Sequence, residues 1–460
     1  MDIGLIFNPV IISVLLLCVL CVRKVNVLLS LIISAIVAGV LAYVPIAQII
    51  SEHWSFGEII HQIFNIPYAD IMNTFVSGMG GNSETALSYI LLGTFAVAMM
   101  HTGLTKVLAN KISAVVKDRK YVLIGILTLL AVFSQNLIPV HIAFIPILVP
   151  PLLGLMNKLK IDRRAIACAL SFGLETPYIV VPAGFGLIFQ GLIRDNLIQN
   201  GMNVGKNDVV NSVWILGIGM FLGLLVALFI TYRKPREYKV TPLTEISEKE
   251  EETKFTKKHA ITLFAAFVTF VTQLATKSLP LGAIAGLTII FGTGVIKHDK
   301  TDKMIDEGVG LMGYIAFVML IAAGYAMVLK STGSIDSLIQ GIMPFMQGSK
   351  FIAAVLMLVI GLFVTMGIGT SFGTIPILAV LFVPICQSSG ISVSATIVIM
   401  AAAAALGDAG SPASDTTLGP TAGLNADGQH NHIHDTCIPT FWHFNIPLII
   451  FALIAVVLFN

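Results

Sequence analysis

Long apolar stretches separated by short polar clusters dominate the pattern of hydrophobic and polar positions along this chain. Many windows approach the ~20 apolar residues that an α-helix needs to cross the hydrocarbon core of a bilayer. The pattern predicts two leading helices, an interrupted helix, a hairpin-like segment, a broken helix and a returning helix, and a similar order in the second half. The predicted segments are 4–22, 25–44, 69–101, 121–157, 164–192, 211–231, 259–276, 279–297, 304–330, 351–387, 393–417 and 440–459.

Composition places the chain among membrane proteins. Of its 460 residues, 56% are hydrophobic and 11% are charged, with a mean hydropathy of +0.91, whereas a soluble domain carries about 25% charged residues. The apolar run 4–22 follows Asp2 and precedes Arg23 and Lys24, which favours a first transmembrane helix over a cleaved signal. We therefore predict an all-α polytopic membrane protein that is surrounded by the lipid bilayer and has no nucleic-acid partner.

An internal repeat with a constant offset runs through the chain. The stretch "HTGLTKVLANKI" begins at His101, and "STGSIDSLIQGI" begins 230 positions later, at Ser331. At the same offset, "FIPIL" from Phe144 corresponds to "TIPIL" from Thr374. Transporters are often built from two such halves. Because a highly charged segment separates the halves, we predict a first repeat at 1–232, a cytoplasmic linker at 233–258 and a second repeat at 259–460.

Basic residues predict that the two repeats have opposite orientations. Lys and Arg concentrate in cytoplasmic loops. The lysine-rich stretch 105–120 corresponds to 335–350, in which Lys350 is the only basic residue. Residues 157–164 hold four basic residues, and the equivalent stretch 387–394 holds none. We therefore predict two inverted-topology repeats with broken helices, about ten transmembrane helices and two re-entrant hairpins. For the hairpin segments, pairs of short spanning helices remain an open alternative.

Four polar interruptions, in two repeat-related pairs, are candidate binding elements. Non-helical backbone at membrane depth is tolerated only where protein or a watery cavity surrounds it. One break taken alone can be a simple kink, but four matched breaks with carboxylates and amides favour a functional site. We expect them to meet near the bilayer midplane around one cavity. They are "SQNLIPVH" (134–141) with "VTMGIGTS" (364–371), and "GLETP" (173–177) with "GDAGSP" (407–412).

Carboxylates and hydroxyls within these breaks are the candidate ligands of a coupling ion. A carboxylate inside the bilayer is costly, so it usually pairs with an ion, a proton or a base. Hydroxyl and carbonyl oxygens suit a hard cation such as Na⁺. The predicted ion-binding or coupling residues are Glu175, Thr365, Thr370, Ser371, Asp408, Ser411, Asp415, Thr416 and Thr417.

Larger polar groups in the first hairpin are the candidate substrate ligands, because amides and imidazoles recognise carboxylates and amino groups. They are Ser134, Gln135, Asn136 and His141. For His141, a role as a proton relay and a role as a packing histidine both remain open.

Other classes of function find little support in the sequence. The chain has no GxxxxGK[ST] motif, which argues against an ATP-driven pump, and nothing supports an enzyme with catalytic residues. The histidines of "HNHIHDTC" (430–437) have a spacing that captures transition metals weakly, but we expect no transition-metal site and no cofactor besides Na⁺ or H⁺ as coupling ion. A passive channel is a less favoured alternative, because it would show neither saturation nor uphill accumulation.

The stretch "GDAGSPASDTT" (407–417), followed downstream by "DTCIP" (435–439), resembles the motif of the NhaC-type Na⁺/H⁺ antiporter family. The likeness covers most of the chain from about residue 70, with an N-terminal extension like that of the YuiF-like subgroup. The matching positions are Gly407, Asp408, Ser411, Pro412, Ser414, Asp415, Thr416 and Thr417.

The resemblance implies a secondary active transporter of the ion-transporter superfamily in the inner (cytoplasmic) membrane, with paired hairpins and an elevator-type motion. It is compatible with a homodimer. The implied function is Na⁺/H⁺ antiport. The pair Ala409-Gly410 stands where antiporters often carry a histidine or a bulkier residue, which leaves room for a larger substrate. The alternative is therefore Na⁺- or H⁺-coupled transport of an amino acid, such as histidine, or of a small carboxylate.

Overall fold

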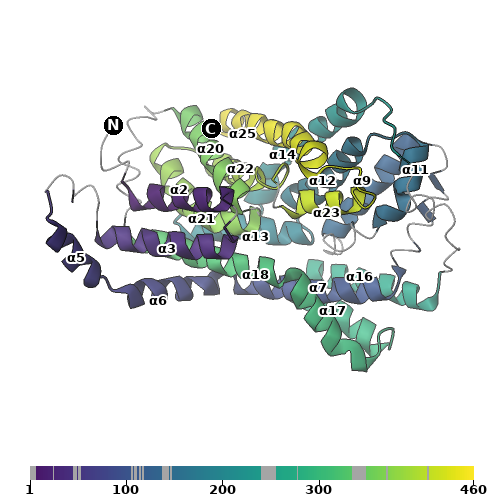
Figure 1. Ribbon diagram of the computed structural model, residues 1–460, viewed down its shortest axis with the longest axis horizontal. Coiled ribbons are helices and arrows are strands. Elements are labelled where there is room, and N and C mark those ends of the chain that lie inside the picture. The colour runs from purple at the N-terminus through teal and green to yellow at the C-terminus, as the bar shows by residue number, and fades with distance from the viewer. Residues whose placement is uncertain are drawn as a thin grey trace.

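All regular structure in the described part of the chain is helical, which confirms the predicted all-α fold (Figure 1). The computed structural model describes the whole chain except residues 1–6, 24, 45–48, 50–52, 105–106, 108–110, 113–114, 117–118, 137–144, 146–147, 240–254, 277, 334–348, 369–370 and 412–413.

The first half contains ten described α-helices and three short 3₁₀- or π-helical turns. The α-helices are α2 (Pro9–Val22), α3 (Val27–Tyr43), α5 (Phe56–Phe64), α6 (Tyr68–Met79), α7 (Ser83–His101), α9 (Lys120–Asn136), α11 (Leu153–Lys158), α12 (Arg163–Val180), α13 (Phe185–Gln199) and α14 (Asp208–Val226). The short turns are η1 (Gly80–Asn82), η2 (Pro150–Leu152) and η3 (Ala227–Thr231).

In the second half, the described α-helices are α16 (Lys257–Thr276), α17 (Leu279–Gly292), α18 (Thr301–Ser331), α20 (Lys350–Ile368), α21 (Ser371–Ser388), α22 (Val393–Ala405), α23 (Asp415–Leu424), α24 (Ile438–Thr440) and α25 (Ile446–Phe459). Its short 3₁₀- or π-helical turns are η4 (His298–Lys300), η5 (His432–Cys437) and η6 (Phe441–Asn445).

The constant offset of the sequence repeat reappears in the helix boundaries. Helices α9 and α20 begin at Lys120 and Lys350, and α12 and α22 begin at Arg163 and Val393, so each pair is 230 positions apart. The equivalent helices are therefore placed by equivalent stretches of sequence. The division of the chain at residues 233–258 stays a prediction.

Equivalent helices begin at opposite ends of the molecule. At the end that holds residues 233–239, here called the linker end, Lys120 Nζ donates to the carbonyl of Arg233 at 3.3 Å. At the other end, here called the far end, Lys350 Nζ lies 3.5 Å from Asn460 Oδ1. In Figure 1, α11 at the linker end lies on the right, and the C-terminus at the far end lies with α20 on the left. This opposition is the inverted arrangement that the basic residues predict.

The second predicted hairpin is formed by α20 and α21, which pack against each other. Its start at Lys350 lies at the far end, and near its end Gln387 Nε2 donates to the carbonyl of Gly201, also at the far end, at 3.0 Å. In the first hairpin segment, α9 starts at the linker end. Near the end of this segment, and also at the linker end, the backbone carbonyl of Lys160 accepts from the backbone N–H of Arg236 at 3.1 Å. Both segments thus return to the end from which they start.

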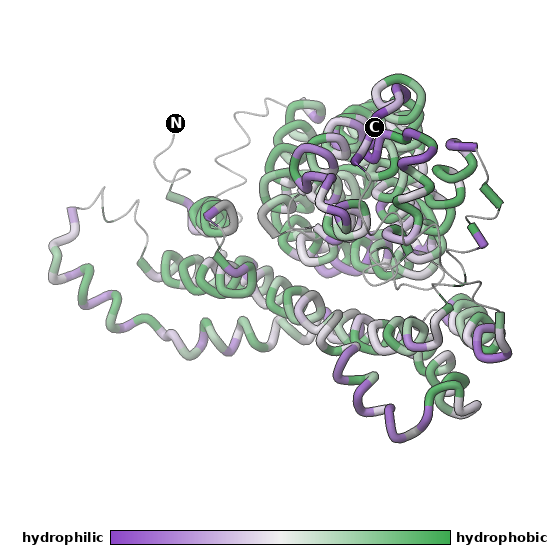
Figure 2. Tube along the Cα trace, turned by 45° about the vertical axis from the view of Figure 1, so that its right-hand side comes forward, coloured by the Kyte–Doolittle hydropathy of each residue, from purple (hydrophilic) through white to green (hydrophobic). Residues whose placement is uncertain are grey.

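The helices form two layers (Figure 2). The support layer consists of α3, α6, α7, α16, α17 and α18, in which α18 packs along α7, α6 and α3. The core bundle consists of α9, α12, α13, α14, α20, α21, α22, α23 and α25. Close approach of α18 and α7 requires Gly308, because a Cβ there would lie 2.5 Å from the Cα of Thr94. Glycine in α18 therefore permits tight packing, and that helix runs unbroken while its counterpart bends by 51° between α6 and α7.

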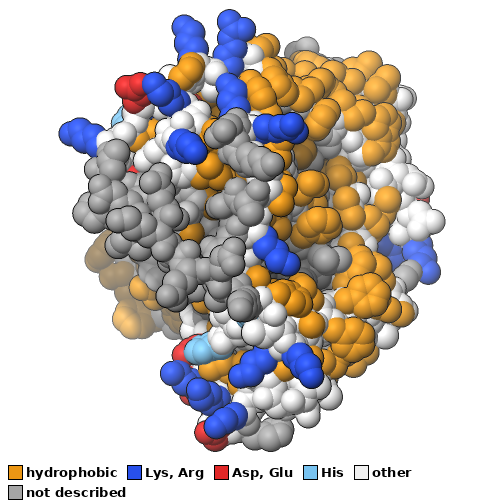
Figure 3. Space-filling model, turned by 90° about the vertical axis from the view of Figure 1, so that its right-hand side faces the viewer, with side chains coloured by type: hydrophobic (Ala, Val, Ile, Leu, Met, Phe, Trp, Pro, Cys, Tyr) orange, Lys and Arg blue, Asp and Glu red, His pale blue; other side chains and the backbone are white. Residues whose placement is uncertain are grey.

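The apolar exterior is that of a membrane protein. Five described helices are long and apolar enough to span a bilayer, and two bent helix pairs bring the number up to seven. On α16, Phe264 and Phe267 leave 58% and 60% of their surface exposed, as expected where lipid replaces water. Lys and Arg side chains instead gather on the linker end (Figure 3). The total of about ten spans stays a prediction.

A buried ion pair holds the linker end of the core bundle together. Arg163, the first residue of α12, donates to both carboxylate oxygens of Asp427 at 2.6 Å, and both side chains are fully shielded from solvent. The guanidinium also donates to the carbonyl of Leu424 at 2.9 Å and lies 4.2 Å from the ring centre of Tyr238. The pair thus ties the start of α12 to the segment that follows α23.

We expect Arg163→Ala to lower the free energy of unfolding by about 3–5 kcal/mol, because it leaves the Asp427 carboxylate shielded and without its partner. Thermal melting in detergent measures the effect. Lys160→Ala is the matched control, since its pair with Glu237 is 58% and 77% exposed and such pairs contribute little. A melting temperature of Arg163→Ala equal to that of the control would contradict this role.

His430 predicts a dependence of stability on pH. Burial lowers the pKa of His430 from 6.5 to about 4, and its Nε2 lies 2.7 Å from Thr436 Oγ1. Below pH ~6.5 the unfolded chain binds a proton that the folded chain does not, so stability falls by up to about 1.4 kcal/mol per pH unit between ~6.5 and ~4. His430→Asn should flatten this slope in melting curves at pH 7.5, 6 and 5, whereas substitution of the exposed His61 should leave it unchanged. Equal slopes in all three proteins would rule out His430 as the cause.

Candidate functional site

The polar break after α22 is an unwound segment, described at residues 406–411 and 414, that leads into α23. At Gly407 an added Cβ would lie 2.3 Å from the carbonyl carbon of Thr365. Gly410 has a φ of +85°, and an added Cβ there would lie 2.6 Å from the Cβ of Phe441. Both positions therefore require glycine. Ser414 then caps α23 by accepting from the backbone N–H of Thr416 at 3.3 Å. The break predicted at "GDAGSP" is confirmed for the described residues of this stretch.

Asp408 lies at the centre of a hydrogen-bonded cluster and is 4% exposed. Its Oδ1 accepts from the backbone N–H of Ser371 at 3.1 Å and lies 3.5 Å from Ser414 Oγ. Its Oδ2 accepts from Ser371 Oγ at 2.5 Å and from the hydroxyl of Tyr178. The unwound segment, the start of α21 and α12 thus converge on one carboxylate. Four donors suit a carboxylate that carries its negative charge.

Sequence reasoning missed two residues that hold this arrangement. Tyr178 reaches Asp408 from α12, and its only local signal is its place one turn after Glu175. Asn445, from the π-helical turn η6, donates its Nδ2 to the carbonyls of Leu406 and Ala409 at 2.7 and 3.0 Å. These bonds satisfy carbonyls that the end of α22 leaves free, so Asn445 positions the unwound segment.

Glu175 is fully buried on α12, and neither of its carboxylate oxygens has a hydrogen-bond partner in the described part of the chain. The N–H of Ala409 faces it without forming a regular hydrogen bond. Tyr178 follows three residues later on the same helix face, so Glu175 lies beside the unwound segment that carries Asp408. An ionised carboxylate without a partner is strongly disfavoured in such a place, whereas a protonated carboxyl or one that holds a cation is not.

The predicted break at "GLETP" is wrong in position. Helix α12 continues through Gly173 and Pro177 to Val180, and the chain breaks at residues 181–184, where α12 and α13 meet at 47°. Pro182 cannot donate a backbone hydrogen bond, and Gly184 has a φ of +57°, so these residues provide the stop that Pro177 does not. Glu175 therefore projects from a rigid helix and not from a loop.

Aromatic rings cover the Asp408 cluster. The ring of Tyr178 lies 4.9 Å from that of Phe189 and 5.4 Å from that of Phe372. Tyr89, on α7 of the support layer, lies 5.2 Å from Phe185 and 6.1 Å from Phe372. Such a cover excludes water and strengthens electrostatic interactions beneath it. The aromatic cluster also forms a contact between the two layers.

The remaining predicted ion ligands lie around the same segment. Thr365 Oγ1 donates to the carbonyl of Ala403 at 2.9 Å, and Ser411 Oγ lies 3.5 Å from the carbonyl of Met366. Thr417 Oγ1 donates to the carbonyls of Ser411 and Ser414 at 2.5 and 2.9 Å. The tip of the second hairpin therefore packs on the unwound segment, as expected.

Two further predicted ion ligands, Asp415 and Thr416, lie in the first turn of α23. Thr416 Oγ1 donates to the carbonyl of Asp408 at 2.7 Å, and Asp415 is partly buried in the first turn. Thr370 lies outside the described residues. The role of the whole set in ion binding stays a prediction.

Three of the predicted substrate residues, Ser134, Gln135 and Asn136, lie at the end of α9, which packs against α12. Ser134 Oγ donates back to the carbonyl of Ala131 at 2.9 Å, and Gln135 is buried with its Oε1 unpartnered among the described residues. Asn136 is the last residue of α9, and His141 lies outside the described residues. Gly173 of α12 lets α9 approach, since a Cβ there would lie 2.6 Å from Ala131 Cβ. Substrate binding by this hairpin stays a prediction.

The histidine-rich run near the linker end is part of a hydrogen-bond network. His432 Nδ1 lies 2.8 Å from Thr421 Oγ1, which donates to Thr436 Oγ1 at 2.9 Å. Within the described ranges, no group of three or more His, Cys, Asp or Glu side chains could hold a metal ion. His430 and His432 thus contact Thr436 and Thr421, which link η5 to α23.

Comparison with known proteins identifies the family. The family model of the Na⁺/H⁺ antiporter family matches residues 169–454, and that of a second Na⁺-H⁺ antiporter family matches residues 8–116. The likeness therefore extends to the N-terminal side of residue 70. Two solved structures share the fold at low sequence identity. They are the YdaH transporter of Alcanivorax borkumensis (TM-score 0.56, 13% identity, 87% of this chain and 89% of that one) and MtrF of Neisseria gonorrhoeae (TM-score 0.56, 14% identity, 84% of each).

Relatives of similar length are much more alike in sequence. An uncharacterized membrane protein of Vibrio parahaemolyticus is 47% identical over 97% of this chain and 99% of its own length. An uncharacterized membrane protein of Haemophilus influenzae is 44% identical over 97% of this chain and 98% of its own length. YuiF of Bacillus subtilis is 47% identical over 84% of this chain and 90% of its own length. The chain is a multi-pass membrane protein that belongs to the Na⁺/H⁺ antiporter family, and it is an ion-coupled secondary transporter.

Proposed function

We propose that this transporter exchanges Na⁺ for H⁺ and that the two ions use Asp408 and Glu175. The observation that carries the proposal is the contrast between two buried carboxylates beside one unwound segment. Asp408 accepts from a full set of donors, and Glu175 has no partner among the described residues. One group is thus built to remain charged, and the other needs a proton or a cation.

The Asp408 cluster has the chemistry of a Na⁺ site. The hydroxyls of Ser371, Ser414 and Tyr178 that donate to Asp408 are rotors, so each can turn its hydrogen away and present an oxygen lone pair to a cation. Carboxylate, hydroxyl and carbonyl oxygens are the ligands that hard cations prefer. Na⁺ would then lie between Asp408 and these hydroxyls, within reach of Glu175.

Charge balance provides the coupling. With H⁺ on Glu175 and Asp408 ionised, the two carboxyls carry one negative charge. With Na⁺ bound and both carboxyls ionised, the net charge of the site is the same. With neither ion bound, two negative charges lie together in a low-dielectric interior, which is strongly disfavoured. H⁺ on Glu175 removes one of the two charges that attract Na⁺, and Na⁺ in turn favours the ionised form of Glu175, so the two ions compete for the site. Alternating occupancy is the basis of an exchange of one Na⁺ for one H⁺.

Motion of the core bundle against the support layer would expose this site to each side in turn. The residues that touch Asp408 belong to the core bundle, while the aromatic cluster joins it to Tyr89 of the support layer. The gathering of Lys and Arg on the linker end supports a cytoplasmic position for that end (Figure 3). The membrane that the protein spans would then be the inner membrane.

Reconstituted proteoliposomes test the exchange. A Na⁺ gradient should drive H⁺ in the opposite direction, reported by a pH-sensitive dye, with a rate that saturates as Na⁺ increases. Potassium at the same concentration serves as the ionic control. Absence of Na⁺-driven H⁺ movement in vesicles shown to contain folded protein would refute the proposal.

Transport of an amino acid coupled to Na⁺ or H⁺ is the second candidate. Its support is the identity of 47% to YuiF, whose name assigns it provisionally to amino acid transport. Uptake of labelled amino acids into the same vesicles separates the candidates. Accumulation driven by a Na⁺ or H⁺ gradient favours the second, and ion exchange without amino acid uptake favours the first.

A further inference from the structure

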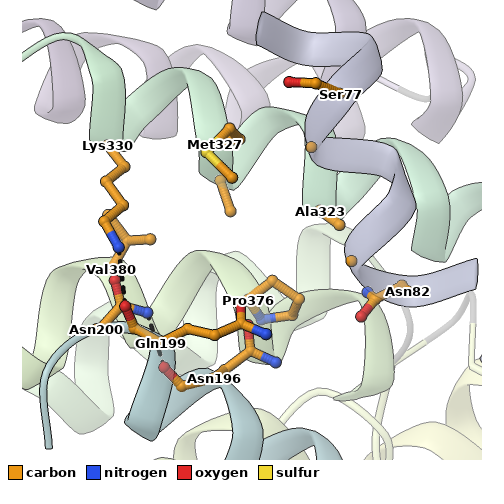
Figure 4. A pocket seen from close by; sticks show the side chains of 13 residues that line it. Ser77, Asn82, Asn196, Gln199, Asn200, Ala323, Met327, Lys330, Pro376 and Val380 are labelled. Carbon is orange, nitrogen blue, oxygen red and sulfur yellow. Dashed lines mark hydrogen bonds between the residues drawn. The ribbon is translucent and has the colours of Figure 1, made fainter.

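A separate cavity of about 100 Å³ lies at the far end, between the support layer and the core bundle. Helices α6 and α18 form one side of it, and α13 and α21 form the other (Figure 4). Pro376 of α21 lines the cavity, five residues after Ser371, which is roughly 7.5 Å along a helix. The cavity therefore lies on the far-end side of the Asp408 cluster and is distinct from it.

One wall of the cavity supplies hydrogen-bond donors and a positive charge. Lys330, near the end of α18, donates to the backbone carbonyl of Gln199 at 2.9 Å, which leaves two of its three ammonium hydrogens for another acceptor. No ion pair among the described residues includes Lys330. The side chain of Gln199 extends from this contact toward Pro376 and adds an amide to the lining (Figure 4). This wall suits a carboxylate.

Three asparagines supply acceptors to the same cavity. Asn82, Asn196 and Asn200 each donate the side-chain NH₂ group to a backbone carbonyl, at 3.1, 2.9 and 2.8 Å. Their amide oxygens are thereby left to accept from another donor. In Figure 4, Asn82 lies apart from Lys330, at the other end of the α6–α18 side, whereas Asn196 and Asn200 belong to the α13 side with Gln199. The cavity thus offers one cationic donor and several neutral acceptors, and its lining contains neither Asp nor Glu.

Size limits the ligand. A cavity of roughly 150 Å³ holds a benzene molecule, with six heavy atoms, so a cavity of about 100 Å³ admits a ligand of comparable or smaller size. A small zwitterion matches both the size and the polar groups. Its carboxylate would contact Lys330 and Gln199, and its ammonium group would contact the amide oxygens of Asn82 and Asn196.

We propose that this cavity is a binding site for a small zwitterionic amino acid, of the size of glycine or alanine, separate from the Asp408 cluster. The proposal goes beyond the exchange of Na⁺ and H⁺ and does not depend on it. Because the cavity lies between the two layers, its ligand would contact both at once.

Binding of labelled glycine to the purified full-length protein tests the proposal. Saturable binding is expected, and Lys330→Gln should weaken it by about tenfold or more, since hydrogen bonds to charged groups contribute ~1.5–3 kcal/mol. Gln199→Leu is a second variant that leaves the charge in place and should also weaken binding. The matched control is Lys350→Gln, a far-end lysine that contacts Asn460 and not the cavity. Melting temperatures verify that each variant is folded.

Competition by acetate and by methylammonium separates a zwitterion site from a simple anion or cation site. Each competitor carries only one of the two charged groups, so each should bind about tenfold or more weakly than glycine. Asp408→Asn should leave glycine affinity unchanged, whether or not this variant exchanges ions. The proposal is overturned if glycine does not bind, if acetate competes as well as glycine, if folded Lys330→Gln binds glycine normally, or if Asp408→Asn abolishes binding.

Discussion

Asp408→Asn should reduce Na⁺-driven H⁺ movement by about 100-fold or more while the protein remains folded. Asparagine keeps the size and shape of the side chain, but it removes the negative charge that attracts Na⁺. It also replaces one acceptor oxygen by an NH₂ group, which would face the donors Ser371 and Tyr178. Hydrogen bonds to a charged group contribute ~1.5–3 kcal/mol each, and ~2.7 kcal/mol corresponds to 100-fold.

Initial rates in proteoliposomes, normalised to the amount of folded protein, measure this effect. Asp195→Asn is the matched control, because Asp195 is an exposed carboxylate of α13 paired with Arg194 at 3.2 Å. The control should transport as the wild type does. Normal exchange by folded Asp408→Asn would remove Asp408 from the ion site, and a large loss of melting temperature would assign it a structural role instead.

The inverted architecture was predictable because two independent signals agree. A fixed offset of 230 residues recurs in the sequence, and the clusters of basic residues in the first copy are almost absent from the equivalent stretches of the second. The break between α22 and α23 was also predictable, since glycine, proline and a capping serine are local signals for the end of one helix and the start of another. Such features are determined by short stretches of sequence, so they can be read without knowledge of tertiary contacts.

The partners of Asp408 could not be predicted in the same way. Tyr178 precedes Asp408 by 230 positions, and their contact exists only because α12 packs beside the unwound segment. Asn445 reaches the same segment from η6. Neither residue stands out locally, because a tyrosine near an aromatic cluster or an asparagine in a transmembrane helix has many ordinary roles. Only their placement in three dimensions assigns them to the site.

The position of the break after α12 illustrates a different limit. Gly173 and Pro177 are typical of a broken helix, but here Gly173 serves the close approach of α9, and the helix continues through Pro177. The chain stops later, at Pro182 and Gly184, where the backbone adopts a positive φ. The consequence for function is large. A carboxylate in a loop could turn toward several donors, whereas Glu175 on a helix is held without one.

Glu175→Gln should abolish the coupling of H⁺ to Na⁺ without unfolding the protein. Glutamine resembles the protonated carboxyl in size and charge, so the fold, which already shields this side chain completely, should keep its melting temperature or gain slightly. The variant can no longer release or take up a proton at this position. Na⁺-driven H⁺ movement should therefore fall by about 100-fold or more, an increase of ~2.7 kcal/mol in the barrier.

Na⁺ binding distinguishes this role from a merely structural one. In the wild type, H⁺ on Glu175 competes with Na⁺ at the adjacent site, so Na⁺ affinity should decrease as pH falls from 8 to 6. In Glu175→Gln, one negative charge is permanently absent, so Na⁺ should bind more weakly but with the same affinity at every pH in this range. The increase of the melting temperature with Na⁺ reports the affinity, because a ligand that binds only the folded state stabilises it by an amount set by its dissociation constant.

Glu307→Gln is the control, since Glu307 pairs with His101 at a position where both side chains are partly exposed, and it should retain the pH dependence of the wild type. If Glu175→Gln also retains that dependence, the competing proton binds elsewhere, and Asp408 and Asp415 are the carboxyls to test next.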